Sequence, residues 1–130
     1  MNITDPEEIR IESDNLKGFV KKLLKKYPDI RPSKEDDWDW TWADDGYELL
    51  EAQDYLQAES KFEQLIVSQP DAFDGYEGLA LTYQAQGRKS EAEILIDHAV
   101  KIATRSLKND AIDREALDEM LAEQLEIHGT

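Results

Sequence analysis

A pattern of small and large apolar residues occurs twice in this chain, and the second copy follows the first by 34 residues. Trp42 of the first copy corresponds to Tyr76 of the second, and Ala58 corresponds to Ala92. The same spacing relates four more pairs: Gly46 and Ala80, Glu59 and Glu93, Phe62 and Ile96, and Ile66 and Val100. A fixed period of this length is typical of stacked helical hairpins, because a single hairpin cannot bury its apolar face alone. We therefore expect an all-α fold.

The two copies resemble the tetratricopeptide repeat, a helix-turn-helix unit of 34 residues. In the first copy the resemblance rests on Trp42, Gly46, Ala58, Phe62 and Pro70. In the second it rests on Tyr76, Leu79, Ala80, Tyr83, Ala92 and Ala99, with Gly87 in the turn. The chain departs from the family pattern at Asp45, Leu49 and Thr104. The resemblance implies two repeats, at about 39–72 and 73–106, that stack as helical hairpins and bind another protein.

Length and composition are consistent with one folded domain. A chain of 130 residues with 40% apolar and 35% charged residues can bury a core and still be highly solvated. It has no cysteine and no run of about 20 apolar residues, so we expect no disulfide, no membrane span and a cytoplasmic location. We expect a basic N-terminal helix and linker over residues 1–37, and a repeat domain with a C-terminal capping helix over residues 38–130.

The net charge of −15 constrains the partners. Binding to a phosphate backbone depends on lysine and arginine, so the acidic body of this domain is not expected to bind nucleic acid directly. An acidic surface instead attracts proteins that carry basic segments.

Residues 14–27 form a basic amphipathic helix in this interpretation. Its apolar stripe is Leu16, Phe19, Val20, Leu23, Leu24 and Tyr27, and its basic face is Lys17, Lys21, Lys22, Lys25 and Lys26. Two interpretations remain open. The stripe could pack on the repeats with the lysines near acids of the same chain, or the helix could dock to a membrane, a nucleic acid or another subunit.

The remaining helices are predicted at 39–52, 56–68, 73–86 and 89–105, and a terminal helix is expected to begin after Asn109 or Asp110. The apolar stripe of that terminal helix is predicted to be Ala111, Ile112, Ala116, Leu117, Met120, Leu121 and Leu125. Its outer face is predicted to carry Asp113, Glu115, Asp118, Glu119, Glu123 and Glu126. The stripe would cover the end of the stack, or pair with a second copy, so the oligomeric state stays open.

The candidate binding surface lies on the first helix of each repeat. Residues 35–60 contain ten acids and no lysine or arginine, together with several aromatic residues. In the tetratricopeptide family the corresponding face lines a groove that receives peptides. The resemblance implies a groove formed by Trp40, Ala43, Tyr47, Leu50, Glu51, Asp74, Glu77, Leu81 and Gln84. Trp40 and Tyr47 would be its anchors. Alternatively, Trp40 packs against the N-terminal helix and the acids are simply solvated.

Catalytic chemistry has no support in the residue pattern. His98 and His128 are 30 residues apart, and neither has a metal-ligand neighbour at helical spacing. Phosphate-binding loops, dinucleotide fingerprints and nucleophile motifs do not occur in the sequence. We expect no enzyme activity, no metal and no cofactor. We expect instead an adaptor or dedicated chaperone that binds a basic or amphipathic segment. Two alternatives are a structural subunit docked through its lysine-rich helix and an acidic mimic of nucleic acid.

Overall fold

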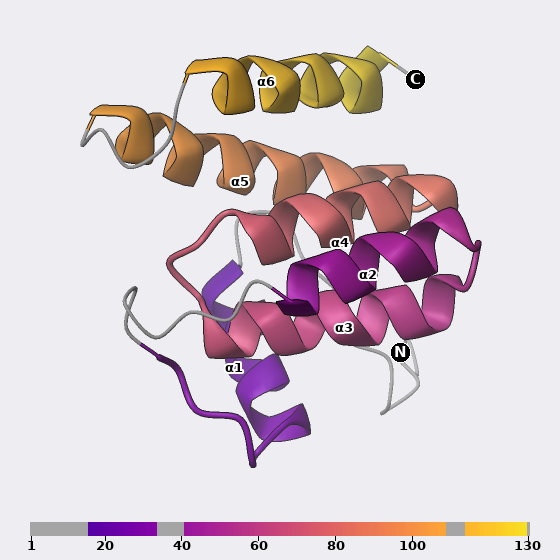
Figure 1. Ribbon diagram of the computed structural model, residues 1–130, viewed down its shortest axis with the longest axis vertical. Coiled ribbons are helices and arrows are strands. Elements are labelled where there is room, and N and C mark those ends of the chain that lie inside the picture. The colour runs from indigo at the N-terminus through magenta and orange to yellow at the C-terminus, as the bar shows by residue number, and fades with distance from the viewer. Residues whose placement is uncertain (1–15, 34–40, 109–113, 130) are drawn as a thin grey trace, which may run out of the picture.

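The computed structural model of the protein describes residues 16–33, 41–108 and 114–129, and all the regular structure in these ranges is helical. The helices are α1 (Leu16–Lys26), α2 (Thr41–Glu51), α3 (Tyr55–Ser68), α4 (Asp74–Ala85), α5 (Lys89–Lys108) and α6 (Arg114–Gly129). From α2 to α6, each helix packs against the next along the chain (Figure 1). The predicted all-α class is confirmed. The expected start of the terminal helix at Asn109 or Asp110 lies outside the described residues.

The first hairpin, α2–α3, closes through hydrogen bonds at the end of α2. The Asp54 N–H donates to the Leu49 carbonyl at 2.9 Å, and the Gln53 N–H donates to the Leu50 carbonyl at 3.0 Å. This pair of bonds is the Schellman arrangement, which needs a left-handed residue just after the helix. Gln53 provides it with φ of 62°. The Asp54 carboxylate then caps α3 by accepting from the Gln57 N–H at 3.4 Å.

The second hairpin, α4–α5, closes in the same way 34 residues later. The Arg88 N–H donates to the Tyr83 carbonyl at 2.8 Å, and the Gly87 N–H donates to the Gln84 carbonyl at 3.0 Å. Gly87 is the left-handed residue, with φ of 78°. The repeat in the sequence therefore corresponds to a repeat in backbone geometry.

The ring of Phe62 links the two hairpins. Phe62 belongs to α3, is fully buried, and lies against Gly46 of α2 and Gly78 of α4. A Cβ atom added to Gly46 would be 2.7 Å from this ring, and one added to Gly78 would be 2.0 Å from it. Both glycines are therefore needed for the close approach of α2 and α4 to the aromatic core.

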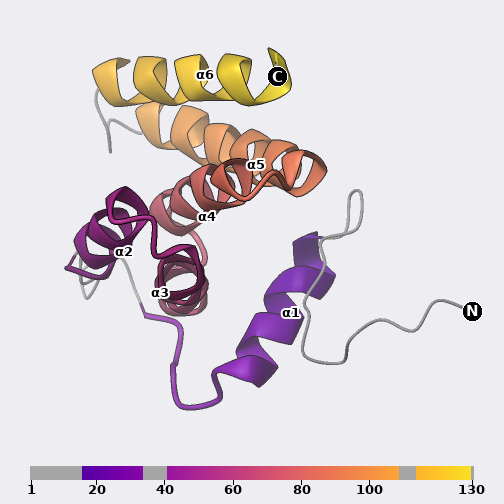
Figure 2. The same ribbon diagram turned by 90° about the vertical axis from the view of Figure 1, so that its right-hand side faces the viewer.

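Helix α1 packs on α3, on the side away from α2 (Figure 2). Its residues Phe19 and Leu23 are buried in the core. At its end, the Lys26 ammonium is 2.8 Å from the Glu63 carboxylate, and the Tyr27 hydroxyl donates to the same carboxylate at 2.7 Å. Glu63 is only 2% exposed, so these partners are needed to compensate its burial. This arrangement agrees with the interpretation in which the basic helix packs on the repeats.

Helix α6 covers α5 with most of the predicted stripe, since Leu117 and Met120 are buried and Leu121 packs against the core as expected. Leu117, Met120 and Ile127 are buried, whereas Leu125 is 75% exposed. The prediction that Leu125 belongs to the covering stripe is wrong, because Ile127 takes the inward position at the end of the helix. Ala111 and Ile112 lie outside the described residues. The end of α6 is held by His128, whose ring nitrogens each lie 2.7 Å from a carboxylate oxygen, of Glu93 and of Asp97.

Candidate protein-binding face

Three helices contribute side chains to one acidic cluster, which we call the acidic face. It consists of Tyr47 of α2, Asp74 and Glu77 of α4, and Glu119 and Glu123 of α6. The Tyr47 hydroxyl donates a hydrogen bond of 3.1 Å to Glu77 Oε1. The carboxyl group of Glu77 is also hydrogen-bonded to that of Glu123. Residues that are far apart in the sequence therefore meet at Glu77.

The core positions Tyr47 and Glu77. The Tyr47 ring packs edge-on against Phe62, with ring centroids 5.1 Å apart and an interplanar angle of 69°. Phe62 in turn fits against α4 at Gly78, next to Glu77. Because this contact fixes both helices relative to one ring, the Tyr47 hydroxyl is aimed at the Glu77 carboxyl group. The Tyr47 side chain is partly buried, and its hydroxyl group binds the carboxyl group of Glu77.

The electrostatics of the acidic face are unbalanced. Burial raises the pKa of Glu77 to about 9, with further contributions from its hydrogen bond to Glu123 and from the charges of Glu123 and Glu119. Burial also raises the pKa of Asp74 to about 6. The pKa of the Tyr47 hydroxyl lies well above its usual range, first because of burial and then because of the charges of Glu77 and Asp74. At neutral pH the Glu77 carboxyl group therefore holds a proton.

No positive charge compensates these acids within residues 16–33, 41–108 and 114–129. None of the ion pairs in these ranges involves Asp74, Glu77, Glu119 or Glu123. In addition, Glu123 Oε1 is buried without a hydrogen-bond partner. In the same ranges no group of three or more metal-ligating side chains has the geometry to hold an ion. The oxygen atoms of these carboxyl groups are hydrogen-bond acceptors, so the cluster can accept N–H donors of an organic cation.

The other residues predicted for the groove have different environments. Ala43 is 6% exposed and belongs to the core, so its predicted role as a contact residue is corrected to a packing role. Leu50 and Leu81 are partly buried and pack against the core while keeping some exposed surface. Gln84 is also partly buried, and Glu51 is exposed. Trp40, the other predicted anchor, lies outside the described residues.

Glu119 and Glu123 are the residues that the sequence analysis missed, since it assigned both to the outer face of the terminal helix. For Glu123 that assignment is wrong, because its carboxyl group reaches Glu77. A signal was available in the spacing. Glu123 follows Met120 by three residues and precedes Ile127 by four, so it shares a stripe with two buried side chains.

The comparisons with known proteins leave the family open. A scan against protein-family models gave no match, and searches among curated proteins and among solved structures gave none either. No helix in the described part of the chain combines the length and the apolar composition needed to cross a membrane.

Proposed function

We propose that this protein is a non-catalytic interaction module, an adaptor or dedicated chaperone, that binds a basic or amphipathic segment of another protein. The acidic face receives a lysine or arginine side chain of that segment. The observation that carries the proposal is the Tyr47–Glu77–Glu123 set, in which acidic groups from two helices converge and form no ion pair within the described ranges. The resemblance of the two sequence copies to tetratricopeptide repeats supports the same function.

Binding would exchange a proton for a partner's cation. Glu77 is protonated at neutral pH because its ionised form would be buried beside Glu123. An ammonium or guanidinium group at this position would stabilise the ionised form and release the proton. Hydrogen bonds from a cation to a carboxylate are shorter and stronger than those between neutral groups. The partner would therefore gain affinity from a site that already contains the acceptors.

The surroundings of the acidic face would add apolar contacts and steering. Leu50 and Leu81 keep part of their surface exposed on the same two helices as Tyr47 and Glu77. They would contact the apolar side of an amphipathic segment. The net charge of −15 would speed the encounter with basic partners at low salt.

Calorimetry with a synthetic helical peptide that carries alternating lysine and leucine faces tests the proposal. Titrations at pH 8 in two buffers of different ionisation enthalpy report the protons released on binding. We expect up to about one proton per peptide, since Glu77 is protonated before binding and ionised afterwards. We expect the Glu77→Gln variant to lose this release and to bind at least about tenfold more weakly, because glutamine cannot become an anion.

The matched control is Glu48→Gln on α2, since Glu48 is exposed and the variant makes the same carboxyl-to-amide substitution away from the acidic face. It should bind the peptide nearly as the parent protein does. Equal affinities and equal proton release for the two variants would refute the assignment of Glu77. Binding of a glutamate-for-lysine version of the peptide with equal affinity would refute the selectivity for cations.

A further inference from the structure

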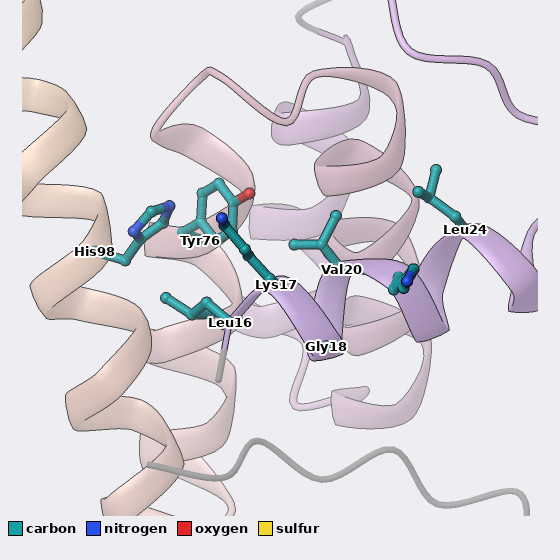
Figure 3. Close-up of a pocket in the computed structure, with 8 residues that line it drawn as sticks. Leu16, Lys17, Gly18, Val20, Leu24, Tyr76 and His98 are labelled. Atoms are coloured by element: carbon teal, nitrogen blue, oxygen red, sulfur yellow. The ribbon is translucent and has the colours of Figure 1, made fainter. Parts of the chain in front are cut away.

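A second concave site lies on the opposite side of α3 from α2, where α1 lies near the start of α4 and the middle of α5. Leu16, Val20 and Leu24 of α1, Tyr76 of α4 and His98 of α5 border a cavity of about 600 Å³, which we call the α1 pocket (Figure 3). This volume is in the range of cavities that receive small ligands or the anchor side chains of a partner. The proposed function does not use this site.

The inner wall of the α1 pocket is rigid and uncharged. The Tyr76 side chain is 2% exposed, and its hydroxyl donates to the Pro70 carbonyl at 3.0 Å. The His98 ring packs edge-on against Tyr76, with centroids 4.6 Å apart. The pKa of His98 is lowered by burial first and then by the charges of Lys101 and Arg105, so its ring stays neutral at physiological pH. The wall therefore favours an apolar group.

The rim of the α1 pocket is cationic. Lys17 and Lys21 line it, no acidic residue does, and yet the chain has twice as many acids as bases. An adjoining cavity of about 240 Å³ shares Leu16 and His98 with it and adds Lys101. The one acid that lines this adjoining cavity is Asp97, which already accepts a hydrogen bond from Gln124 and pairs with His128.

These lysines differ from Lys26 at the end of the same helix. Lys26 is paired with the buried Glu63 and attaches α1 to α3. In the parts of the chain that the structure describes, Lys17, Lys21 and Lys101 take part in no ion pair. The basic face of α1 thus contains a structural lysine and, about two turns away, lysines that are available to an anionic partner.

We infer that the α1 pocket docks an acidic amphipathic segment of a second protein, with an apolar side chain in the cavity and carboxylates on Lys17 and Lys21. Charge complementarity identifies the occupant, since its acids would meet the only cationic rim next to an apolar cavity among the cavities described. A membrane fits less well. The apolar surface is a cavity lined from α1, α4 and α5, which suits an inserted side chain better than the plane of a bilayer.

Fluorescence anisotropy with a labelled synthetic helix of about 14 residues, with leucines every three or four positions and glutamates between them, tests this site. We expect saturable binding that weakens with salt. We expect the double variant Lys17→Glu/Lys21→Glu to weaken binding by about tenfold or more, because two attractive pairs become repulsive. The matched control, Lys22→Glu/Lys25→Glu, changes the same charge on the same helix at residues that do not line the cavity, and we expect at most about a twofold change.

A second variant tests the cavity itself. Val20→Trp fills it without changing the charge, and we expect about a tenfold loss of peptide binding with the helical circular dichroism retained. Equal losses in the two charge variants, or no effect of Val20→Trp, would overturn the docking site. The docking site for an acidic segment would also be overturned by one further outcome. In that outcome the labelled peptide does not bind, while vesicles containing phosphatidylserine bind the protein in a way that depends on Lys17 and Lys21.

Discussion

The two hairpins have the same turn geometry but differ in how their first helices are packed. Helix α2 buries two residues, Ala43 and Gly46, whereas α4 buries seven. The reason is position, because α4 packs extensively against α3 and α5 and also against α2, whereas in the described residues the main contacts of α2 are with α3 and α4. A helix at the edge of the stack can present a polar group such as the Tyr47 hydroxyl, while the central helix carries the packing. Equivalent sequence positions therefore acquire different roles from their place in the stack.

The largest expected effect is a difference in stability between alanine variants of the two glycines that contact Phe62. We expect Gly78→Ala on α4 to lower the free energy of unfolding by about 3 kcal/mol, at the upper end of overpacking effects, since its Cβ would be 2.0 Å from the ring. Gly46→Ala on α2, with 2.7 Å, should cost about 1 kcal/mol, because the edge helix can shift. Urea unfolding followed by circular dichroism measures both values.

The control for this pair is Gly129→Ala, because nothing lies within 4 Å of a Cβ at that position. In a background with Phe62→Leu, the extra cost of Gly78→Ala should become smaller, since the smaller side chain leaves room. Equal costs at Gly46 and Gly78 would contradict the proposed difference between the edge helix and the central helix.

The second effect concerns pH and Glu77 of the central helix. The pKa of this carboxyl group rises from 4.5 in the unfolded chain to about 9 in the fold, so the folded state holds more protons between these values. Stability must therefore fall as pH rises through this window. Glu77→Gln keeps an acceptor for the Tyr47 hydroxyl and cannot ionise. We expect it to stabilise the protein at pH 8 by about 1 kcal/mol or more, and to have little effect at pH 5.

Thermal melts at several pH values measure this effect, with Glu48→Gln on the edge helix as the control. That variant should leave the pH dependence of the melting temperature unchanged. A parent protein whose stability is flat between pH 5 and pH 9 would show that the proton on Glu77 is not held in the fold.

The third effect is the change in stability when the left-handed residue of each turn is replaced. Gln53 and Gly87 occupy equivalent left-handed positions, and only glycine adopts this conformation at low cost. We expect Gln53→Gly to stabilise the protein by about 0.5–1 kcal/mol and Gly87→Ala to destabilise it by about 1 kcal/mol. Chemical unfolding measures both changes. Changes of the same sign would show that the two turns are not equivalent.

The smallest effect lies in α6, which covers the second hairpin. The pKa of His128 lies above its usual value, mainly because His128 is hydrogen-bonded to Asp97. The charges of Asp97 and Glu93 raise it further. The stability that protonated His128 contributes is therefore fully present below about pH 6.5. It is lost as the pH rises through the pKa of His128 in the folded state. We expect His128→Gln to cost less than about 1 kcal/mol at pH 5.5, since exposed ion pairs are screened, and almost nothing at pH 8.5.

Melts of the Glu77→Gln and His128→Gln variants, singly and together, separate the two titrations. Each substitution should remove its own part of the pH dependence. A loss from His128→Gln that is equal at both pH values would mean that packing, and not charge, is what His128 provides.

The fold was more predictable from the sequence than the candidate site. Helix ends at Lys26 and Ser68 agree with the positions of Pro28 and Pro70, and the cap at Asp54 and the left-handed turn at Gly87 follow from local chemistry. Two residues of the predicted groove, Tyr47 and Glu77, are joined by a hydrogen bond in the structure. The third member of the candidate site, Glu123, was missed because its role depends on how far α6 rotates about its own axis, and the inward position of Ile127 sets that rotation.

Three features follow from the amino-acid sequence alone: the positions of the helices, their pairing as hairpins with a period of 34 residues, and the strongly acidic composition. These are consequences of local periodicity, capping and composition. Other features depend on tertiary packing: the Phe62 ring fits against two glycines, α1 packs on α3, and Glu77 meets Glu123. The reason is that contacts between distant residues depend on the packing of whole helices, and a shift of a fraction of a turn changes which side chains face each other.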